Sequence, residues 1–244
     1  MNKIKKNWNT LFNESNHPYN LRLNELKFTK NKTNISTINV LYPEMSEEQI
    51  LRINKYIARK IKLKFISSIL DFGSGTGNFL LYCQKSKKIK KVSIEINHRF
   101  IKHQKKILRL TKFINPKNGL NYLKNIQSNS IDAILCNSVF QYLRKKDTLK
   151  VIDGLIRIAK KDILILDIKN LKKKTYWENM QMKRYNLNSK TFRERYKFYN
   201  ISFFSKKEIS YFLKKKKNIT FKIEDNVRYL KDHKFGFMVH IKKN

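Results

Sequence analysis

Three of the chain's six glycines lie within five residues, at Gly73, Gly75 and Gly77. An apolar run at 66–72 precedes them, and an apolar segment at 79–81 follows. Glycines at alternate positions let the backbone turn sharply and approach a ligand where a Cβ would collide. The first turn of a following helix presents free N–H groups that suit an anion. The sequence therefore predicts a ligand-binding turn between a buried strand and a helix, with a plain structural turn as the alternative.

Hydrophobic periodicity predicts an α/β domain around this turn. Strands are expected at 66–72, 91–97, 112–114, 131–136 and 163–168, and helices at 47–62, 98–110 and 148–159. Strands that alternate with helices indicate a parallel sheet with right-handed crossovers. Two further strands, at 220–224 and 235–241, have no room for a helix between them and should form an antiparallel hairpin.

Two capping boxes mark helix starts, and the organisation of the chain follows from the pattern. Ser46 with Gln49, and Ser205 with Glu208, have the spacing of an N-cap residue and its reciprocal partner. We expect an N-terminal arm or flap at 1–45 and one domain at 46–244. Within that domain, 169–204 is a cap insertion and 219–243 is the C-terminal hairpin. The insertion is longer than an ordinary connection between a strand and a helix.

The formal net charge of +37 admits two interpretations. Phosphate backbones attract lysine-rich surfaces, which favours nucleic acid as a partner. Codon bias is the alternative, because Asn, Ile and Lys are abundant while alanine and proline number only three each. Bias does not explain why only 18 residues are acidic, so a basic surface that attracts anions is expected in either case.

The remaining composition narrows the class of protein. Cys83 and Cys136 fall in apolar segments and are expected to be buried thiols, not a disulfide or metal ligands. No apolar run reaches the length of about 18 residues that spans a bilayer. The basic N-terminus has no apolar stretch behind it, so no secretory signal is predicted and a cytoplasmic location is expected.

The glycine turn departs from two nucleotide-binding motifs. A dinucleotide fingerprint places its third glycine one residue later than Gly77. The Lys-Ser/Thr pair of a P-loop is absent. Asp71, just ahead of the first glycine, suits a ligand with an amino group, and the amides of the turn suit its carboxylate. S-adenosylmethionine carries both groups.

The segment 71–77, DFGSGTG, resembles the first motif of class I S-adenosylmethionine-dependent methyltransferases. Glu95, at the end of the second predicted strand, stands where that family has its ribose-binding acid. The resemblance implies a Rossmann-like, mostly parallel sheet of seven strands with helices on both faces. It also implies S-adenosylmethionine as the cofactor. The cofactor-binding residues that it implies are Asp71, Gly73, Ser74, Gly75, Gly77, Glu95, Ile96, Asn118, Gly119 and Asn137, and an Asn-Gly turn is the alternative for Asn118 and Gly119.

The segment 132–143 resembles the fourth-strand motif of the same family, whose downstream end faces the transferred methyl group. Asn137 is followed by Ser-Val-Phe, so the NPPY-type tetrad of methyltransferases that act on amino groups of nucleic acids is absent. The segments 138–143 and 166–170 are loosely similar to small-molecule and sugar methyltransferases of polysaccharide or secondary-metabolite pathways.

The catalytic base is not identified by the sequence. Tyr142, Asp167, His17 and His233 are candidates because they could border the acceptor, and Tyr142 and His233 are the two retained. A surface or core role is the favoured interpretation for each histidine, and a packing role is the alternative for Tyr142. No group of residues has metal-ligand spacing, so no metal is expected.

Aromatic and basic side chains alternate through the cap insertion, including Tyr176, Trp177, Arg184 and Phe192. Such a surface suits sugars, nucleotide-linked sugars or single-stranded RNA. The alternative is a cap that buries its aromatics. Three functions remain open: a methyltransferase acting on oxygen or nitrogen of a sugar or anionic metabolite, an RNA methyltransferase, and a catalytically silent cofactor-binding scaffold.

Overall fold

The computed structural model describes residues 45–84, 88–116, 119–184, 186–196, 201–228, 230 and 233–244. The predicted arm lies outside the described residues except for Met45, and so do His17 and Asn118. The domain boundary at residue 45 therefore stays a prediction. Within the described ranges, no helix is both long and apolar enough to cross a membrane.

A seven-stranded sheet forms the centre of the domain, in the order β3-β2-β1-β4-β5-β7-β6. Its strands are β1 (Ser68–Phe72), β2 (Lys90–Ile94), β3 (Thr111–Ile114), β4 (Ile131–Asn137), β5 (Ala159–Lys169), β6 (Ile219–Asp225) and β7 (Gly236–Lys243). Strands β1 to β5 pair in parallel, whereas β7 is antiparallel to both β5 and β6. The predicted mostly parallel sheet with a C-terminal antiparallel pair is confirmed.

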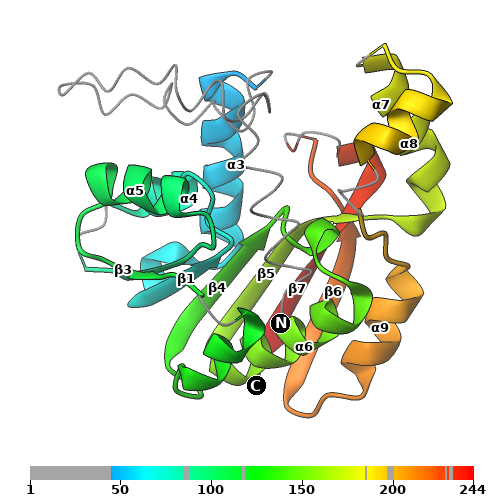
Figure 1. Ribbon diagram of the computed structural model, residues 1–244. Helices are drawn as coiled ribbons and strands as arrows, with labels where there is room; N and C mark the ends of the chain where they lie inside the picture. Colours follow the sequence, from blue (N-terminus) through cyan, green and yellow to red (C-terminus); the bar gives the residue numbers. More distant parts are fainter. Residues whose placement is uncertain are drawn as a thin grey trace.

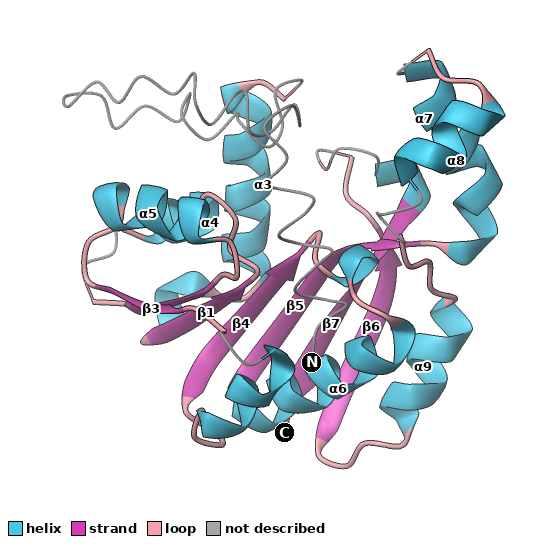
Figure 2. Ribbon diagram, viewed as in Figure 1, coloured by secondary structure: helices cyan, strands magenta, loops and turns pink. Residues whose placement is uncertain are grey.

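Helices cover both faces of this sheet (Figure 1). One layer holds α3 (Glu47–Lys60), α4 (Asn78–Cys83) and α5 (His98–Ile107), and the other holds α6 (Lys145–Ile158) and α9 (Lys206–Lys214). Two more helices, α7 (Lys174–Arg184) and α8 (Ser189–Tyr196), stand beyond the end of the sheet (Figure 2). They belong to the predicted cap.

Each face of the sheet has its own hydrophobic core. Ile50, Ile53 and Ile57 of α3 pack with Phe79 and Leu80 of α4 on one face. The apolar stripe of α6 and the buried side of α9 pack on the other face. All five residues of β1 are buried, as expected for a parallel strand covered on both sides. The continuous apolar pattern of 66–72 is explained by this position.

Both predicted capping boxes are present. The side chain of Ser46 accepts from the Gln49 amide while the Gln49 side chain accepts from the Ser46 amide, at 3.2 and 2.9 Å. The Ser205–Glu208 pair opens α9 in the same reciprocal way. These contacts satisfy amides that a helix leaves without partners in its first turn.

The element boundaries differ from the predictions at one place in particular. β5 begins at Ala159, four residues earlier than predicted, and it follows α6 without a loop. The apolar Ala159 ends the helical stripe and also begins the strand, so periodicity alone could not divide the two. Similarly, the connection between β6 and β7 contains a short 3₁₀ helix, His233–Phe235, so the antiparallel pair is joined by a longer turn than a tight hairpin.

Candidate active site

The glycine turn lies where the order of the sheet reverses. The chain passes from β1 to β2 on one side of the sheet, and β4 then returns to the other side of β1. In open α/β sheets, ligands bind beside the carboxyl ends of strands at such a point. The turn at 73–77, Glu95 after β2 and Asn137 at the end of β4 therefore share one edge of the sheet.

All three glycines of the turn have a left-handed backbone, with φ values of 71° at Gly73, 55° at Gly75 and 81° at Gly77. A Cβ added at Gly73 would lie 2.4 Å from Cγ2 of Val139. At Gly77 it would lie 3.0 Å from Cγ of Gln104. The turn thus needs glycine both for its conformation and for the closeness of its neighbours.

Backbone amides of the turn are used to build it. Gly73 and Ser74 donate to the carbonyl of Ile94 at 2.8 and 3.2 Å, and Gly77 donates to the carbonyl of Ser74 at 2.8 Å. The Gly75 amide donates to Oε2 of Glu95 at 2.8 Å. The expectation that these amides hold the carboxylate of a ligand stays a prediction. In this conformation they fasten the turn to the end of β2.

Gln104 of α5 holds the turn from the outside, a role that the sequence analysis missed. Its side chain is fully buried. Nε2 donates to Oγ of Ser74 at 2.7 Å and to the carbonyl of Gly75 at 2.6 Å, while Oε1 accepts from Ser93 Oγ at 2.5 Å. The only available signal was a glutamine on the apolar side of a basic helix. That signal predicts burial but not its partners.

Two buried carboxylates lie beside the turn, on Asp71 and Glu95, each about 4% exposed. Burial, together with the charge of Glu95, raises the pKa of Asp71 to about 7. Burial also raises the pKa of Glu95 to about 7, against the amides of Asn97 and Gly75 that stabilise its charged form. Both groups thus favour a ligand that brings positive charge or hydroxyl donors.

The end of β4 carries the other predicted contact, Asn137, which is half-buried. The next residue, Ser138, has a left-handed φ of 57°, and Val139 then packs against Gly73. The hydroxyl of Ser138 lies 3.3 Å from Oδ1 of Asn137 and 2.9 Å from Oδ2 of Asp167. β4 and the glycine turn are therefore in direct contact.

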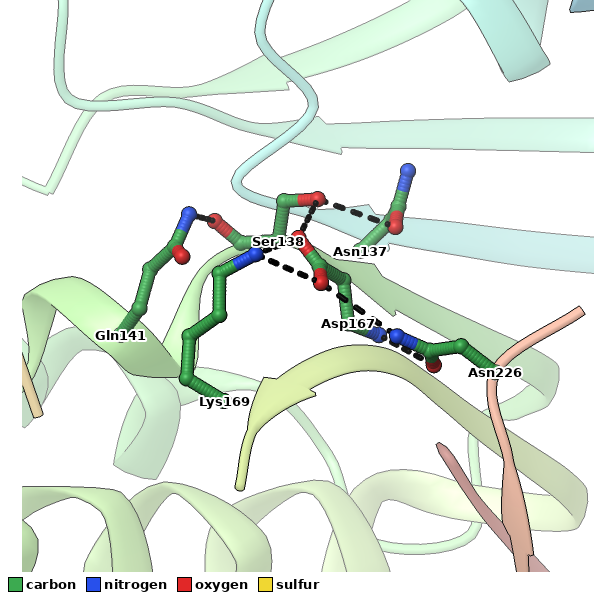
Figure 3. Close-up of polar contacts among 6 residues, drawn as sticks. All are labelled: Asn137, Ser138, Gln141, Asp167, Lys169 and Asn226. Carbon is green, nitrogen blue, oxygen red and sulfur yellow. Dashed lines mark hydrogen bonds and ion pairs between the residues drawn. The ribbon is translucent and has the colours of Figure 1, made fainter. Parts of the chain in front are cut away.

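Asp167 lies in a buried polar cluster (Figure 3). Its carboxylate accepts from Nζ of Lys169 at 3.0 and 3.2 Å, and from Nδ2 of Asn226 at 3.4 Å. Together with the bond from Ser138, these contacts occupy the carboxylate with donors. Such an environment suits a group that holds its neighbours in place better than one that accepts a proton.

The other candidates fall at the same edge of the sheet. Tyr142 ends a 3₁₀ helix, Phe140–Tyr142, after β4, and it is half-buried. His233 precedes β7, whose first residue Gly236 pairs with Lys169 at the end of β5. The roles of Tyr142 and His233 as the base stay predictions.

Two of the predicted cofactor contacts lie in loops after strands. Ile96 follows β2 and is half-buried, and Gly119 opens a 3₁₀ helix, Gly119–Asn125, after β3. Asn118 lies outside the described residues. Since β3 is adjacent to β2, the Gly119 segment lies on the predicted side of the site.

The cap buries most of its described aromatic side chains. Trp177, Phe192 and Phe203 form a small core with Phe235, separate from the two cores of the sheet. The rings of Trp177 and Phe203 meet edge to face with their centroids 5.5 Å apart. Tyr176 is an exception with 57% of its surface exposed. The alternative of a cap that buries its aromatic side chains is thus confirmed for Trp177, Phe192 and Phe203.

The predicted burial of both cysteines is confirmed, since Cys83 and Cys136 are buried free thiols. Burial raises the pKa of Cys83 to about 12 and that of Cys136 well above its usual value. Thiols are nucleophilic as thiolates. These two are consequently structural. Within the described ranges, no group of three or more His, Cys, Asp or Glu side chains is arranged to hold a metal ion.

Comparisons with known proteins agree with this geometry. Residues 70–162 match a family described as a methyltransferase domain. That segment begins in β1 and ends in β5, and it contains the glycine turn, Glu95 and Asn137. No curated protein sequence matches the chain.

Several solved structures share the fold over nearly the whole chain. The plantazolicin methyltransferase BamL, in complex with a triazolic desmethylPZN analog and SAH, is 16% identical with a TM-score of 0.59. The alignment covers 99% of this chain and 98% of that one. Magnesium protoporphyrin IX methyltransferase (ChlM) from Synechocystis PCC 6803 with bound SAH is 10% identical, with a TM-score of 0.60 and coverage of 97% and 98%.

A third similar structure is the methyltransferase domain of bacterial CtHen1, at 12% identity and a TM-score of 0.55. It covers 80% of this chain and 100% of that domain. At these identities the likeness concerns the fold, whereas the family match concerns the residues that form the site. The family match over residues 70–162, the reversed strand order and the glycine turn with its two buried carboxylates together indicate a methyltransferase domain with the class I, Rossmann-like fold.

Proposed function

We propose that the enzyme transfers a methyl group to an oxygen or nitrogen atom of a small molecule, which is either a sugar or an anionic metabolite. The observation that carries this proposal is the position of the cap. Its two ends are fastened beside β4, because Phe204 donates to the carbonyl of Lys169 and Ser202 donates to that of Gln141, both at 2.8 Å. The cap therefore bounds the proposed acceptor site next to the methyl donor, and a bounded site favours an acceptor of limited size.

The site residues fit the cofactor. The left-handed glycines allow a ligand close to the backbone, where a Cβ would collide with Val139 or Gln104. The Asp71 carboxylate is buried beside the turn, and it suits the amino group of the methionyl part. Glu95 accepts from the amides of Gly75 and Asn97 at 2.8 Å. A carboxylate has about four acceptor positions, so it can also accept from the ribose hydroxyls.

When bound, S-adenosylmethionine supplies an electrophilic methyl carbon on a positively charged sulfur. The protein has to hold the acceptor atom in line with that carbon, and such positioning can contribute about 7–11 kcal/mol in model reactions. We assign this task to the end of β4, through Asn137 and Ser138, and to the cap. A hydroxyl acceptor also needs to lose its proton, and Tyr142 and His233 remain the proposed groups for that step.

The net positive charge of the protein supports an anionic acceptor. The net charge of +37 attracts anions and raises their local concentration at the surface. A negatively charged acceptor atom is also a better nucleophile toward a sulfonium whose charge disappears in the transition state. Two structures with a similar fold are a plantazolicin methyltransferase in complex with a triazolic desmethylPZN analog and a magnesium protoporphyrin IX methyltransferase.

An RNA methyltransferase is the second candidate, and one surface feature favours it. A groove between α9 and β6 is lined by Lys206, Lys207, Lys214 and the exposed Tyr211. Basic and aromatic side chains together suit single-stranded nucleic acid. However, three strands, β4, β5 and β7, separate β6 from β1 in the sheet. At about 4.8 Å between neighbouring strands, β6 is about 19 Å from β1 across the sheet, so the groove lies to one side of the glycine turn.

Transfer of labelled methyl groups into an extract of the source cells separates the candidates. We expect label in the small-metabolite fraction, with a rate that decreases as salt screens the attraction of anions. Label in RNA, lost on Lys207→Glu and Lys214→Glu substitution, would support the second candidate instead. Tight binding of S-adenosylhomocysteine with no label in any fraction would identify a silent scaffold.

A further inference from the structure

The strands β4 and β5 end in an unusual combination of charge and backbone conformation. Asp167 and Lys169 form a buried ion pair in which the two side chains are 8% and 4% exposed. Burying two charges carries a desolvation penalty that their attraction often does not recover. The pair is therefore poorly explained as a source of stability, and another role has to account for it.

The backbone around the pair is also constrained. Ser138 and Asp167 both have a φ of 57°, in the left-handed region that side chains disfavour. The pairing of β5 with β7 shifts register between Ile165 and Ile168. Irregularities of this kind re-aim a side chain, and strained residues persist where the surroundings hold them. Here they direct the carboxylate of Asp167 toward the hydroxyl of Ser138 (Figure 3).

Each partner of the carboxylate belongs to a different wall of the site. Ser138 follows Asn137, and the next residue, Val139, packs against Gly73 of the glycine turn. Lys169 is the first residue of the cap insertion, and its carbonyl accepts from the Phe204 amide where the cap returns. The ion pair thus links the cofactor side of the site with the root of the cap.

Gln141 and Asn226 complete this link. Nε2 of Gln141 donates to the backbone carbonyl of Ser138 at 3.2 Å. The backbone carbonyl of Gln141 accepts from the amide of Ser202, where the cap returns. Oδ1 of Asn226 accepts from the Asp167 amide at 3.3 Å. A Cβ at Gly236 would lie 2.3 Å from Nδ2 of Asn226. The cluster is therefore packed on the β7 side as well, which leaves little room for rearrangement.

We infer that Asp167 and Lys169 are acceptor-positioning residues, whose ion pair fixes the end of β4 and the root of the cap relative to each other. The inference rests on the proposed function, since it assumes that the acceptor binds between these two walls. Neither residue is a catalytic residue here, because they act through Ser138 and through the cap backbone.

A test compares Asp167→Asn with a matched control on the same strand. Asp162 lies near the other end of β5 and is also buried, with Oδ1 2.7 Å from Nε2 of His240. Asp162→Asn therefore makes the same chemical change in a buried pair away from the site. The double variant Asp167→Asn/Lys169→Met removes both charges and leaves no unpaired ammonium.

Two kinds of measurement are needed. The first is the apparent KM and kcat for transfer from labelled S-adenosylmethionine, against dilutions of the small-metabolite fraction, with calorimetry of S-adenosylhomocysteine binding. The second is deuterium exchange of the amides at 138–143 and 201–205, which needs no acceptor. Thermal unfolding of every variant reports the change in stability.

We expect Asp167→Asn to lower kcat/KM for the acceptor at least tenfold, with S-adenosylhomocysteine affinity within about threefold of wild type. Exchange in both segments should be at least tenfold faster than in Asp162→Asn. The double variant should regain thermal stability but keep the low kcat/KM. Recovery of kcat/KM in the double variant, or equal effects of Asp167→Asn and Asp162→Asn, would overturn the inference. A wild-type enzyme that labels no small metabolite would refute the proposed function, and the exchange data would still decide whether the pair joins the two walls.

Discussion

Replacement of Gly73 by alanine tests the geometry of the glycine turn. The new Cβ would lie 2.4 Å from Cγ2 of Val139, and φ at this residue is +71°. A side chain in the left-handed region costs about 1–2 kcal/mol. Forcing an extra methyl into a packed site costs about 1–3 kcal/mol. The smaller freedom of the unfolded chain returns about 0.4–1 kcal/mol. We therefore expect a net loss of about 1–5 kcal/mol in the free energy of unfolding.

Urea denaturation with and without S-adenosylhomocysteine measures this loss, and a double-mutant cycle separates its causes. Val139→Ala removes the atom that the new methyl group meets, so Gly73→Ala and Val139→Ala together should be less destabilising than the sum of the two changes. The coupling should be about 1–3 kcal/mol, the whole overpacking contribution.

Gly154→Ala is the matched control. Gly154 lies in α6, and its added Cβ would meet only the flexible side chain of Leu123, at 3.0 Å. Alanine is favoured over glycine in a helix by about 0.5–1 kcal/mol, so this variant should be close to neutral. A Gly73→Ala protein as stable as Gly154→Ala, with no coupling to Val139, would refute the reasoning about the turn.

Three further predictions concern the same site. Because burial raises the pKa of both Asp71 and Glu95 to about 7, above their unfolded values, these carboxylates reduce stability progressively as pH rises from about 4 to 7. Glu95→Gln should flatten that decrease, and an unchanged pH profile of unfolding would contradict it. Ligand binding should favour the charged carboxylates, so calorimetry in two buffers at pH 7 should show proton release that is smaller in Glu95→Gln. Gln104→Leu should destabilise the protein by about 1–3 kcal/mol, because buried polar partners lose their hydrogen bonds. It should also weaken S-adenosylhomocysteine binding, and unaltered affinity would show that Gln104 does not hold the turn. Trp177→Ala should loosen the cap core, seen as faster proteolysis within 174–196, while cofactor affinity stays the same. If Trp177→Ala also lowered the affinity for the cofactor, the cap would not be a separate packing unit.

The sequence predicted the sheet well because the signals for a buried parallel strand are local. β1 is entirely buried and its sequence is a nearly continuous apolar run. Helix starts were predicted for the same reason, since Ser46 and Gln49 lie within one turn. The start of β5 was missed because Ala159 is compatible with both the helix and the strand.

The polar contacts of the site depend on residues distant in the chain, and the sequence could not predict them. Gln104 meets Ser74 across 30 residues, and Ser138 meets Asp167 across 29. The acids Asp71 and Glu95 could be found because a family motif places them. Lys169 could not, because one buried lysine among 55 basic residues carries no sequence signal.

A crystal structure with S-adenosylhomocysteine tests most directly whether the cofactor binds at the glycine turn and Glu95. We expect the ribose hydroxyls within hydrogen-bonding distance of the Glu95 carboxylate and the amino-acid part against 73–77, with its amino group facing Asp71. A nucleoside bound at another edge of the sheet, or a turn at 73–77 filled by protein side chains, would contradict the account.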